Sequence, residues 1–434
     1  MIDGYAEDAA VSRPKRRAIT RPVTDSWRRR KERKPKVRAF TRVTEKKNVH
    51  VGSMDVSIYL VVTILILIGI IMVFSASYAS AAMSSRWNHD AFFFLRRKGI
   101  IAIVCFIVMN LLANLSYEMI RPFSWLVYAI TVGLLIAVVF VGIASGGAQR
   151  WLPFPIIERF QPSEIAKVTT IFFIAFLVER FPRALHSWSG LFGFTAVIGV
   201  NAALVFYGDF SGSIIVAGIG FGLVFIASPH FWRFIIAGGS GVAAVGLFLW
   251  WDSVFAGGFR GRRFTVWLDP FSEQMDMGFQ IVNSLYAVAM GGWFGVGIGQ
   301  SRQALILPEA HNDIIFAIIV EELGFVGAAL ILTLFGILVW RGVIVALKAP
   351  DMFSSMTAFG IVFALAFQTI INIAVATNSI PNTGVTLPFI SYGGTSLLVS
   401  TAMAGVLLNI SRYSKDKKPR KRKGRDRRSP EYYD

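Results

Sequence analysis

The chain has 434 residues, of which 54% are hydrophobic and only 16% are charged, and its mean hydropathy is +0.57. Soluble domains carry about 25% charged residues, so this composition excludes an ordinary soluble protein and indicates an integral membrane protein. The formal net charge of +18 would suggest a nucleic-acid partner only if it were spread over the whole chain.

The positive charge is concentrated in the two ends of the chain. Residues 1–55 contain 16 Lys and Arg against 7 Asp and Glu, which gives +9, and residues 411–434 contain 11 against 4, which gives +7. The body, residues 56–410, contains 17 against 15 and therefore carries only +2. We expect two disordered basic tails beside anionic membrane lipids, and no nucleic-acid partner for the body.

Spanning helices of about 20 apolar residues are predicted at ten places. They centre on Val56–Tyr78, Gly99–Leu115, Trp125–Ala144, Ile165–Val178, Leu191–Tyr207, Ser213–Ala227, Phe234–Trp251, Ile314–Trp340, Ser354–Ala376 and Thr395–Ile410. The predicted fold class is all-α, a polytopic membrane bundle of ten transmembrane helices. Its single cysteine, Cys105, excludes a disulfide within one chain.

Orientation follows from the preference of Lys and Arg for cytoplasmic loops. With ten spans, both basic tails lie on the cytoplasmic side. The outer loops then hold more cations than the rule expects, namely Arg86, Arg96, Arg97, Lys98, Arg150, Arg159, Arg260, Arg262, Arg263 and Arg302. Either these side chains pair with outer carboxylates and lipid phosphates, or they form a site for a phosphate-bearing substrate.

The longest outer segment, about residues 252–312, concentrates acidic, basic and aromatic residues. Within it, the glycines of Gly291–Gly299 would let the backbone approach a ligand closely or form a turn at the membrane interface. Intramembrane charges are predicted at Lys167, Glu321 and Glu322. Such charges face the bundle interior and often pair, so a structural Lys–Glu contact and a catalytic role both stay open.

Four ordered motifs resemble one protein family. They are Gly147–Trp151 (GAQRW), Gln161–Lys167 (QPSEIAK), Leu307–Gly324 (LPEAHNDIIFAIIVEELG) and Gly384–Ser396 (GVTLPFISYGGTS). Together with the ten-span layout they resemble the SEDS family (shape, elongation, division and sporulation), and most of all its cell-division branch. The resemblance implies a peptidoglycan glycosyltransferase that polymerises lipid II at the outer face of the cytoplasmic membrane.

Such transfer needs a carboxylate to deprotonate the acceptor hydroxyl and cations near the leaving diphosphate. The family carries an essential aspartate in the large outer loop, in an Asn-Pro-x-x-Asp-Pro pattern from which this chain departs. Asp269, before Pro270, is the first candidate for the base, and Glu273 is the second, ahead of Asp276. A solvated acidic turn is the alternative for those that are not catalytic.

The candidate substrate-binding residues lie mostly on the outer side. They are Arg150, Arg159, Arg262, Arg263, Glu164, Lys167, His311 and Ser391. For the arginines the alternative is an ion pair with Glu158, Glu164 or another loop carboxylate. For His311 it is a place in the entry to the eighth helix, and for Ser391 it is turn formation. Mg²⁺ or Mn²⁺ could neutralise the diphosphate, but the sequence shows no dedicated ligand set for either.

The resemblance also implies partners and a location. A class B penicillin-binding protein, which crosslinks the new strand, and other division proteins are expected at the septum. Competing hypotheses are an elongation- or sporulation-branch polymerase, a flippase for lipid-linked precursors, and a scaffold. A transporter would place its charges near the midplane and show internal repeats, whereas the candidate charges here lie in outer loops.

Overall fold

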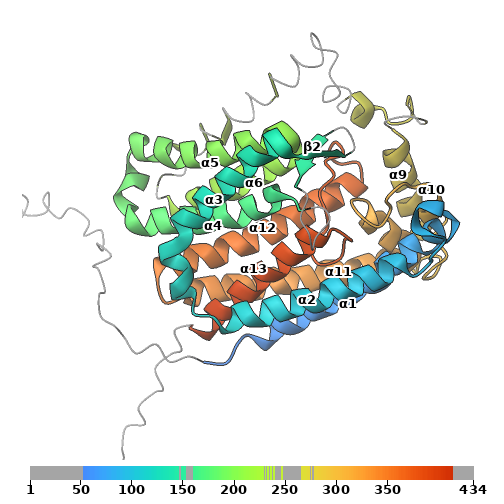
Figure 1. The fold of residues 1–434 in the computed structure, drawn as a ribbon, viewed down its shortest axis with the longest axis horizontal. Helices are drawn as coiled ribbons and strands as arrows, with labels where there is room; N and C mark the ends of the chain where they lie inside the picture. Colours follow the sequence, from blue (N-terminus) through green and yellow to red (C-terminus); the bar gives the residue numbers. More distant parts are fainter. Residues whose placement is uncertain are drawn as a thin grey trace, which may run out of the picture. The chain divides into compact units, whose positions relative to one another are not determined.

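The computed structural model describes residues 52–145, 148–152, 160–228, 230, 232–233, 235–236, 238–239, 246–247, 265–273, 275 and 278–413. Its long helices, which run side by side in Figure 1, are α1 (Val56–Met83), α2 (Phe93–Asn114), α3 (Ile120–Val141), α4 (Pro162–Arg180), α5 (Trp188–Gly208), α6 (Phe210–Ala227), α11 (Ile315–Lys348), α12 (Met352–Ala376) and α13 (Gly394–Arg412). The shorter helix α9 (Phe279–Gly291) runs across one end of this bundle in the same view. The short elements are η1 (Ser85–Trp87), η2 (Tyr117–Met119), β1 (Ile143–Ser145), β2 (Ala148–Trp151), η3 (Pro182–His186) and α10 (Gln303–Ile306).

Seven of the described helices are long and apolar enough to cross a membrane. They are α1, α3 with η2, α5, α6, α11, α12 and α13. The charges within α2 and α4 lower the hydropathy of these two helices, although their lengths of 22 and 19 residues suit a span. The predicted helical membrane fold is confirmed. Each predicted span coincides with a long helix except the seventh, Phe234–Trp251, which lies mostly outside the described residues.

Polar contacts define the two ends of the bundle. At one end, here called the tail end, the main-chain N–H of Gly52 donates to the Arg412 carbonyl (2.8 Å), and the N–H of Asp55 donates to Ser411 Oγ (3.0 Å). The chain therefore enters α1 where it leaves α13. The opposite end, where α2, α4, α11 and α13 begin, is here called the site end.

Helix starts follow from capping side chains. Asp55 Oδ1 accepts from the N–H of Ser57 (3.0 Å) and starts α1. Asp351 accepts from the N–H of Ser354 (2.8 Å) in a capping box that starts α12. Such caps satisfy N–H groups that have no partner within the helix, which matters most where no water is present to replace them.

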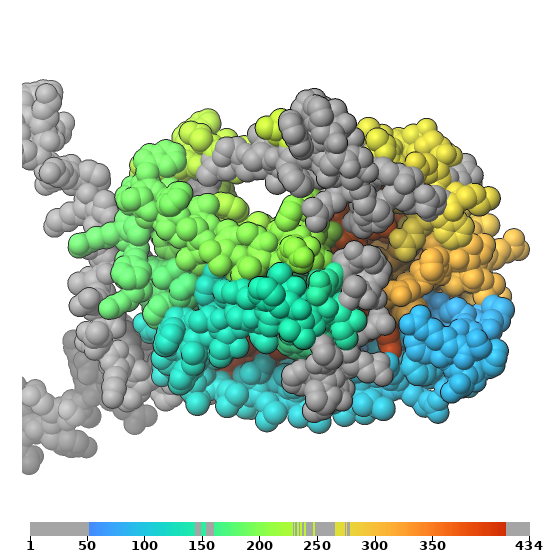
Figure 2. Space-filling model, turned by 45° about the horizontal axis from the view of Figure 1, so that its top comes forward, coloured from blue at the N-terminus to red at the C-terminus, as the bar shows by residue number. Residues whose placement is uncertain are grey.

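The most enclosed helices come from the end of the chain. In Figure 1, α12 and α13 lie within the bundle between α4 and α11. On the face drawn in Figure 2, only small parts of the red C-terminal segment are visible between the other helices. Large apolar side chains such as Phe140, Phe192 and Trp340 are instead 79%, 75% and 70% exposed. This distribution suits a bundle whose outer faces contact lipid.

A short two-stranded sheet follows α3 and was not predicted. Strands β1 and β2 pair antiparallel, with Ser145 opposite Ala148 and Ile143 opposite Trp151 and an irregularity after Ile143. Gly208, at the end of α5, packs on this ribbon so closely that a Cβ there would lie 2.2 Å from the Gln149 carbonyl oxygen. The contact places Arg150, in β2, at the site end.

The glycine-rich segment packs against a break in α11. Gly324 interrupts the helix with φ 68°, and a Cβ on Gly295 (φ 77°) would lie 2.1 Å from the Glu322 carbonyl oxygen. The N–H groups of Val296 and Gly297 donate to the carbonyls of Glu321 and Glu322. The prediction was an approach to a ligand or a turn at the membrane interface, whereas the glycines here allow close packing against the backbone of α11.

Candidate active site at the site end of the bundle

Two candidate carboxylates lie on a turn in the described part of residues 252–312. Asp269 is exposed and Glu273 is partly buried. The main-chain oxygen of Asp269 accepts from Ser272 Oγ (2.7 Å), and that of Glu273 accepts from the N–H of Gly278 (3.1 Å). A Cβ at position 278 would lie 2.4 Å from the Pro270 carbonyl oxygen, so the closure of this turn requires glycine.

The turn is attached to the loop that follows α12. Trp267 Nε1 donates to the Asn378 carbonyl (2.9 Å), and Asn378 Nδ2 donates to the Trp267 carbonyl (3.3 Å). In α9, Ser284 Oγ donates to the carbonyl of Ala376, the last residue of α12 (2.8 Å). These bonds hold Asp269 and Glu273 at the site end.

The start of α4 carries a buried ion pair. Lys167 Nζ lies 2.7 Å from Glu164 Oε1, and the two side chains are only 2% and 11% exposed. Pro162 at the helix start and an i, i+3 spacing place both charges on the inner face of the helix. Each charge therefore has a partner on its own helix, whereas Glu321 and Glu322 lie elsewhere with other partners.

Asp209 joins α4 to α6, and sequence reasoning missed it. Its Oδ2 accepts from Gln161 Nε2 (3.1 Å) and Ser163 Oγ (3.4 Å), while Oδ1 accepts from the N–H of Gly212 (2.9 Å) and caps α6. An aspartate directly before an apolar run is a signal for such a cap. Its second role, in fixing the QPSE segment, depends on residues 46 and 48 positions away and has no local signal.

Arg150 lies beside these residues on β2. Its guanidinium carbon is 5.7 Å from the centre of the Trp151 ring. Its Nε is buried and has no hydrogen-bond partner among the described residues. A planar donor group held over an aromatic ring with an unused N–H suits an anionic ligand.

The third and fourth family motifs interlock. Ser391 Oγ donates to the Asn312 carbonyl (2.8 Å), and the N–H of Tyr392 donates to the His311 carbonyl (3.1 Å). Asn372 Nδ2, from α12, donates to the carbonyls of Asp313 (2.8 Å) and Val385 (2.7 Å). His311 and Ser391 are thus parts of one connected structure at the site end.

His311 lies in an aromatic environment. It is 8% exposed, and its ring centre lies 4.3 Å from that of Phe94 and 5.2 Å from that of Tyr392. Burial lowers the pKa of His311 to about 4, against a smaller opposing effect of the Glu309 carboxylate. The imidazole is therefore neutral at pH 7 and could serve as a hydrogen-bonding group but not as a cation.

Glu321 and Glu322 have structural partners. Glu321 accepts from Ser301 Oγ (2.5 Å) and from the N–H of Arg302 (2.9 Å), which fixes the start of α10. Glu322 accepts from Ser75 Oγ of α1 (2.6 and 2.7 Å). Both side chains are 1% exposed, and neither forms an ion pair with a lysine in the described parts of the chain.

One difference from the sequence prediction concerns the start of the second helix. The prediction began this span at Gly99 and placed Arg96, Arg97 and Lys98 in an outer loop, but α2 begins at Phe93 and contains all three. Lys98 is 1% exposed. It is therefore an interior cation and not a loop cation.

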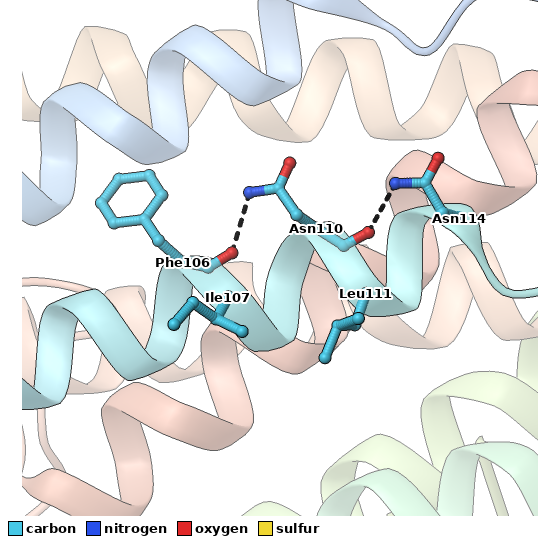
Figure 3. Close-up of a pocket in the computed structure, with 5 residues that line it drawn as sticks. All are labelled: Phe106, Ile107, Asn110, Leu111 and Asn114. Atoms are coloured by element: carbon cyan, nitrogen blue, oxygen red, sulfur yellow. Dashed lines mark hydrogen bonds between the residues drawn. The ribbon is translucent and has the colours of Figure 1, made fainter.

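Figure 3 shows a surface groove on α2 that is separate from the site end. It is lined by Phe106, Ile107, Asn110, Leu111 and Asn114. The amides of Asn110 and Asn114 donate to carbonyls four residues earlier, each at 2.8 Å. None of the candidate site residues lines this groove.

The comparisons with known proteins decide the family. The model of the cell cycle proteins FtsW, RodA and SpoVE matches residues 55–416. This chain belongs to that family. The resemblance found in the four motifs is therefore confirmed, and the FtsW/RodA/SpoVE match extends over the whole helical body.

Relatives within the FtsW/RodA/SpoVE family cover most of the chain. Stage V sporulation protein E of Bacillus subtilis is 39% identical over 371 residues, which are 84% of this chain and 98% of that protein. A probable peptidoglycan glycosyltransferase FtsW of Saccharophagus degradans is 38% identical over 386 residues, 84% of this chain and 95% of that protein.

Solved structures agree with the helical fold. A chain from a peptidoglycan synthase complex that coordinates polymerisation and crosslinking has a TM-score of 0.70 and 25% identity, and the match covers 84% of this chain and 99% of that one. The rod shape determining protein RodA of Thermus thermophilus has a TM-score of 0.61 and 23% identity, covering 84% and 98%.

Four of the predicted catalytic or substrate-binding residues lie outside the described residues. They are Arg159, Arg262, Arg263 and Asp276. Among the residues that the structure does describe, no three His, Cys, Asp or Glu side chains are grouped so that they could hold a metal ion.

Proposed function

We propose that this chain is a peptidoglycan glycosyltransferase that polymerises lipid II into glycan strands at the outer face of the cytoplasmic membrane. The observation that carries the proposal is the match to the FtsW/RodA/SpoVE family over residues 55–416, with relatives named probable peptidoglycan glycosyltransferase. The site end supports it, because carboxylates and a cation with an unused donor lie at one end of a membrane bundle.

In the proposed reaction, Asp269 is the general base. It removes the proton from the 4-hydroxyl of the acceptor sugar as this oxygen attacks the anomeric carbon of the donor. The bond from that carbon to the diphosphate oxygen breaks, and the polyprenyl diphosphate leaves with the bonding electrons. The configuration at the donor carbon is inverted. Glu273, four residues further along the same turn, is the second candidate for the base.

Cations stabilise the charge that develops on the leaving group. Arg150 has an unused N–H for this purpose, and Arg159, Arg262 and Arg263 are assigned the same role from their sequence positions. The ion pair of Glu164 and Lys167, together with His311 and Ser391, completes the proposed substrate site. A divalent cation, if it takes part, would add its charge to the diphosphate.

The proposed topology has ten transmembrane helices, with both basic tails, residues 1–55 and 411–434, in the cytoplasm and the large loop, about residues 252–312, outside. The proposed partners are a class B penicillin-binding protein and other division proteins. The structural relative in a synthase complex that couples polymerisation to crosslinking supports the first of these. We assign the chain to septal synthesis, with sporulation as the alternative because of the relative in Bacillus subtilis.

The test is polymerisation of lipid II by the purified protein with its penicillin-binding partner. The Asp269→Asn variant should lose roughly 10²- to 10⁴-fold in rate, the usual contribution of a general base. Glu118→Gln is the matched control, since Glu118 is an exposed carboxylate in η2 at the tail end.

Three outcomes would change the assignment. A normal rate in Asp269→Asn with a large loss in Glu273→Gln would move the base to Glu273. Movement of lipid-linked precursor across the membrane without strand formation would replace the polymerase by a flippase. Recruitment of division proteins with neither activity would leave a scaffold.

A further inference from the structure

Lys98 is an interior cation that the proposed reaction does not use. Its side chain is 1% exposed, and its Nζ donates to the main-chain carbonyls of Gly69 (2.9 Å) and Ser391 (3.2 Å) and to that of Ile390. An ammonium group has three N–H donors, so these three acceptors satisfy it completely. No described carboxylate forms an ion pair with it.

The carbonyls that Lys98 binds come from two separate segments in close contact. A Cβ on Gly69, in α1, would lie 2.7 Å from the Phe389 carbonyl oxygen and 2.8 Å from Ile390 Cα. The loop before α13 therefore touches the backbone of α1. Phe389 has φ 65°, a left-handed conformation that a side chain with a Cβ disfavours. The contacts around the loop must therefore compensate for this conformation.

The loop in turn holds two candidate site residues. Ser391 Oγ accepts from the N–H of Leu387 (2.8 Å) and donates to the Asn312 carbonyl (2.8 Å). The next residue, Tyr392, donates its N–H to the His311 carbonyl (3.1 Å). A continuous series of hydrogen bonds thus runs from the Lys98 ammonium through Ser391 to the segment that carries His311.

A lysine without a carboxylate partner is a costly way to hold a loop inside a membrane bundle. A neutral glutamine would supply two N–H donors and methionine none, whereas only an ammonium group supplies three charge-assisted bonds here. We propose that Lys98 is a positioning residue, whose ammonium group holds residues 389–391 against α1 and thereby places Ser391 and His311 at the site end.

The first arm of the test measures hydrogen exchange in the full-length protein in detergent. In Lys98→Met, the amides of Leu387, Ser391 and Tyr392 should exchange at least about 10-fold faster than in wild type, the loss expected for charge-assisted bonds. Amides within α12 should keep their rates. Lys98→Gln should show a smaller increase. Lys348→Met, at an exposed lysine near the end of α11, is the control.

The second arm rests on the proposed function and measures lipid II polymerisation by the same variants. Lys98→Met should lower kcat/KM by about 10-fold or more, because Ser391 and His311 belong to the proposed substrate site and their displacement weakens the binding of substrate and transition state. Lys98→Gln should recover part of kcat/KM.

The outcomes separate the positioning role of Lys98 from the proposed polymerase function. Unchanged exchange rates of the loop amides in Lys98→Met would overturn the positioning role, whether or not the variant keeps its activity. Unfolding of both variants would also overturn it, in favour of a purely structural lysine. A wild-type protein that does not polymerise lipid II would refute the proposed function, whereas the exchange rates would still decide whether Lys98 holds the loop.

Discussion

Replacing Lys167 with methionine should destabilise the bundle far more than replacing both members of its ion pair. The Lys167 and Glu164 charges are 2.7 Å apart and almost completely buried. At an effective dielectric constant of about 20, two charges at this distance attract by about 6 kcal/mol. Much of that attraction offsets the cost of removing both groups from water, so the intact pair contributes little net stability.

The single variant removes the attraction and leaves Glu164 buried without its partner. We expect a loss of about 3–5 kcal/mol in the free energy of unfolding for Lys167→Met. The double variant Glu164→Gln/Lys167→Met removes both charges and should return to within about 1 kcal/mol of wild type.

The assay is unfolding of the purified protein in detergent, with wild type, Glu164→Gln, Lys167→Met and the double variant compared as a double-mutant cycle. Lipid II polymerisation by the double variant then decides between the two roles of the pair. Recovered activity indicates a structural pair, whereas recovered stability without activity indicates contact with substrate. A loss below about 1 kcal/mol in Lys167→Met, or a double variant no more stable than the single one, would refute this reasoning.

Two further predictions concern the glycine segment and His311. Gly295→Ala should lower the free energy of unfolding by about 1–3 kcal/mol, because the residue has a positive φ and the new Cβ would clash with the Glu322 carbonyl. Gly336→Ala, in open space on α11, should stabilise the protein by about 0.5–1 kcal/mol. Equal effects of the two substitutions would contradict the close packing. Burial lowers the pKa of His311 to about 4. The folded state therefore binds fewer protons than the unfolded state between about pH 6.5 and 4. The contribution of His311 to the free energy of unfolding falls as the pH falls through that range. His311→Phe should reduce this fall by an amount on the order of 3 kcal/mol, measured by denaturant unfolding at pH 7 and pH 4, and an unchanged pH dependence would contradict a buried neutral imidazole.

The helical body could be predicted because hydropathy is a property of each segment alone. The start of α2 could not. Lys98 follows Arg96 and Arg97, and such a basic run is typical of a loop. Its buried position could not be predicted, because the carbonyls that accept its three N–H bonds lie 29, 292 and 293 residues away. The β1–β2 ribbon was missed for a related reason. Its strands have three and four residues, and a contact with Gly208 helps to fix it.

In the candidate site, too, contacts between nearby residues could be predicted and contacts between distant residues could not. The pairing of Lys167 with Glu164 follows from a spacing of three residues and could have been chosen from the sequence over a contact with Glu321 or Glu322. The cap at Asp209 also has a local signal. The support of Asp269 through Trp267 and Asn378 joins residues 111 positions apart. The sequence therefore predicts candidate site residues and their local partners, whereas only the fold shows the distant residues that position them.

The hydrogen bond between Gly52 and Arg412 brings the first and last residues of the helical body into contact. A short linker between these two positions, with new ends opened in an exposed loop, would give a circular permutant that keeps every helix in its place. The same closeness means that the segments carrying +9 and +7 are attached at a single point. A partner or lipid cluster that recognises positive charge would therefore meet the two tails as one bivalent unit, and removing either tail should weaken such binding by more than its own share of the charge.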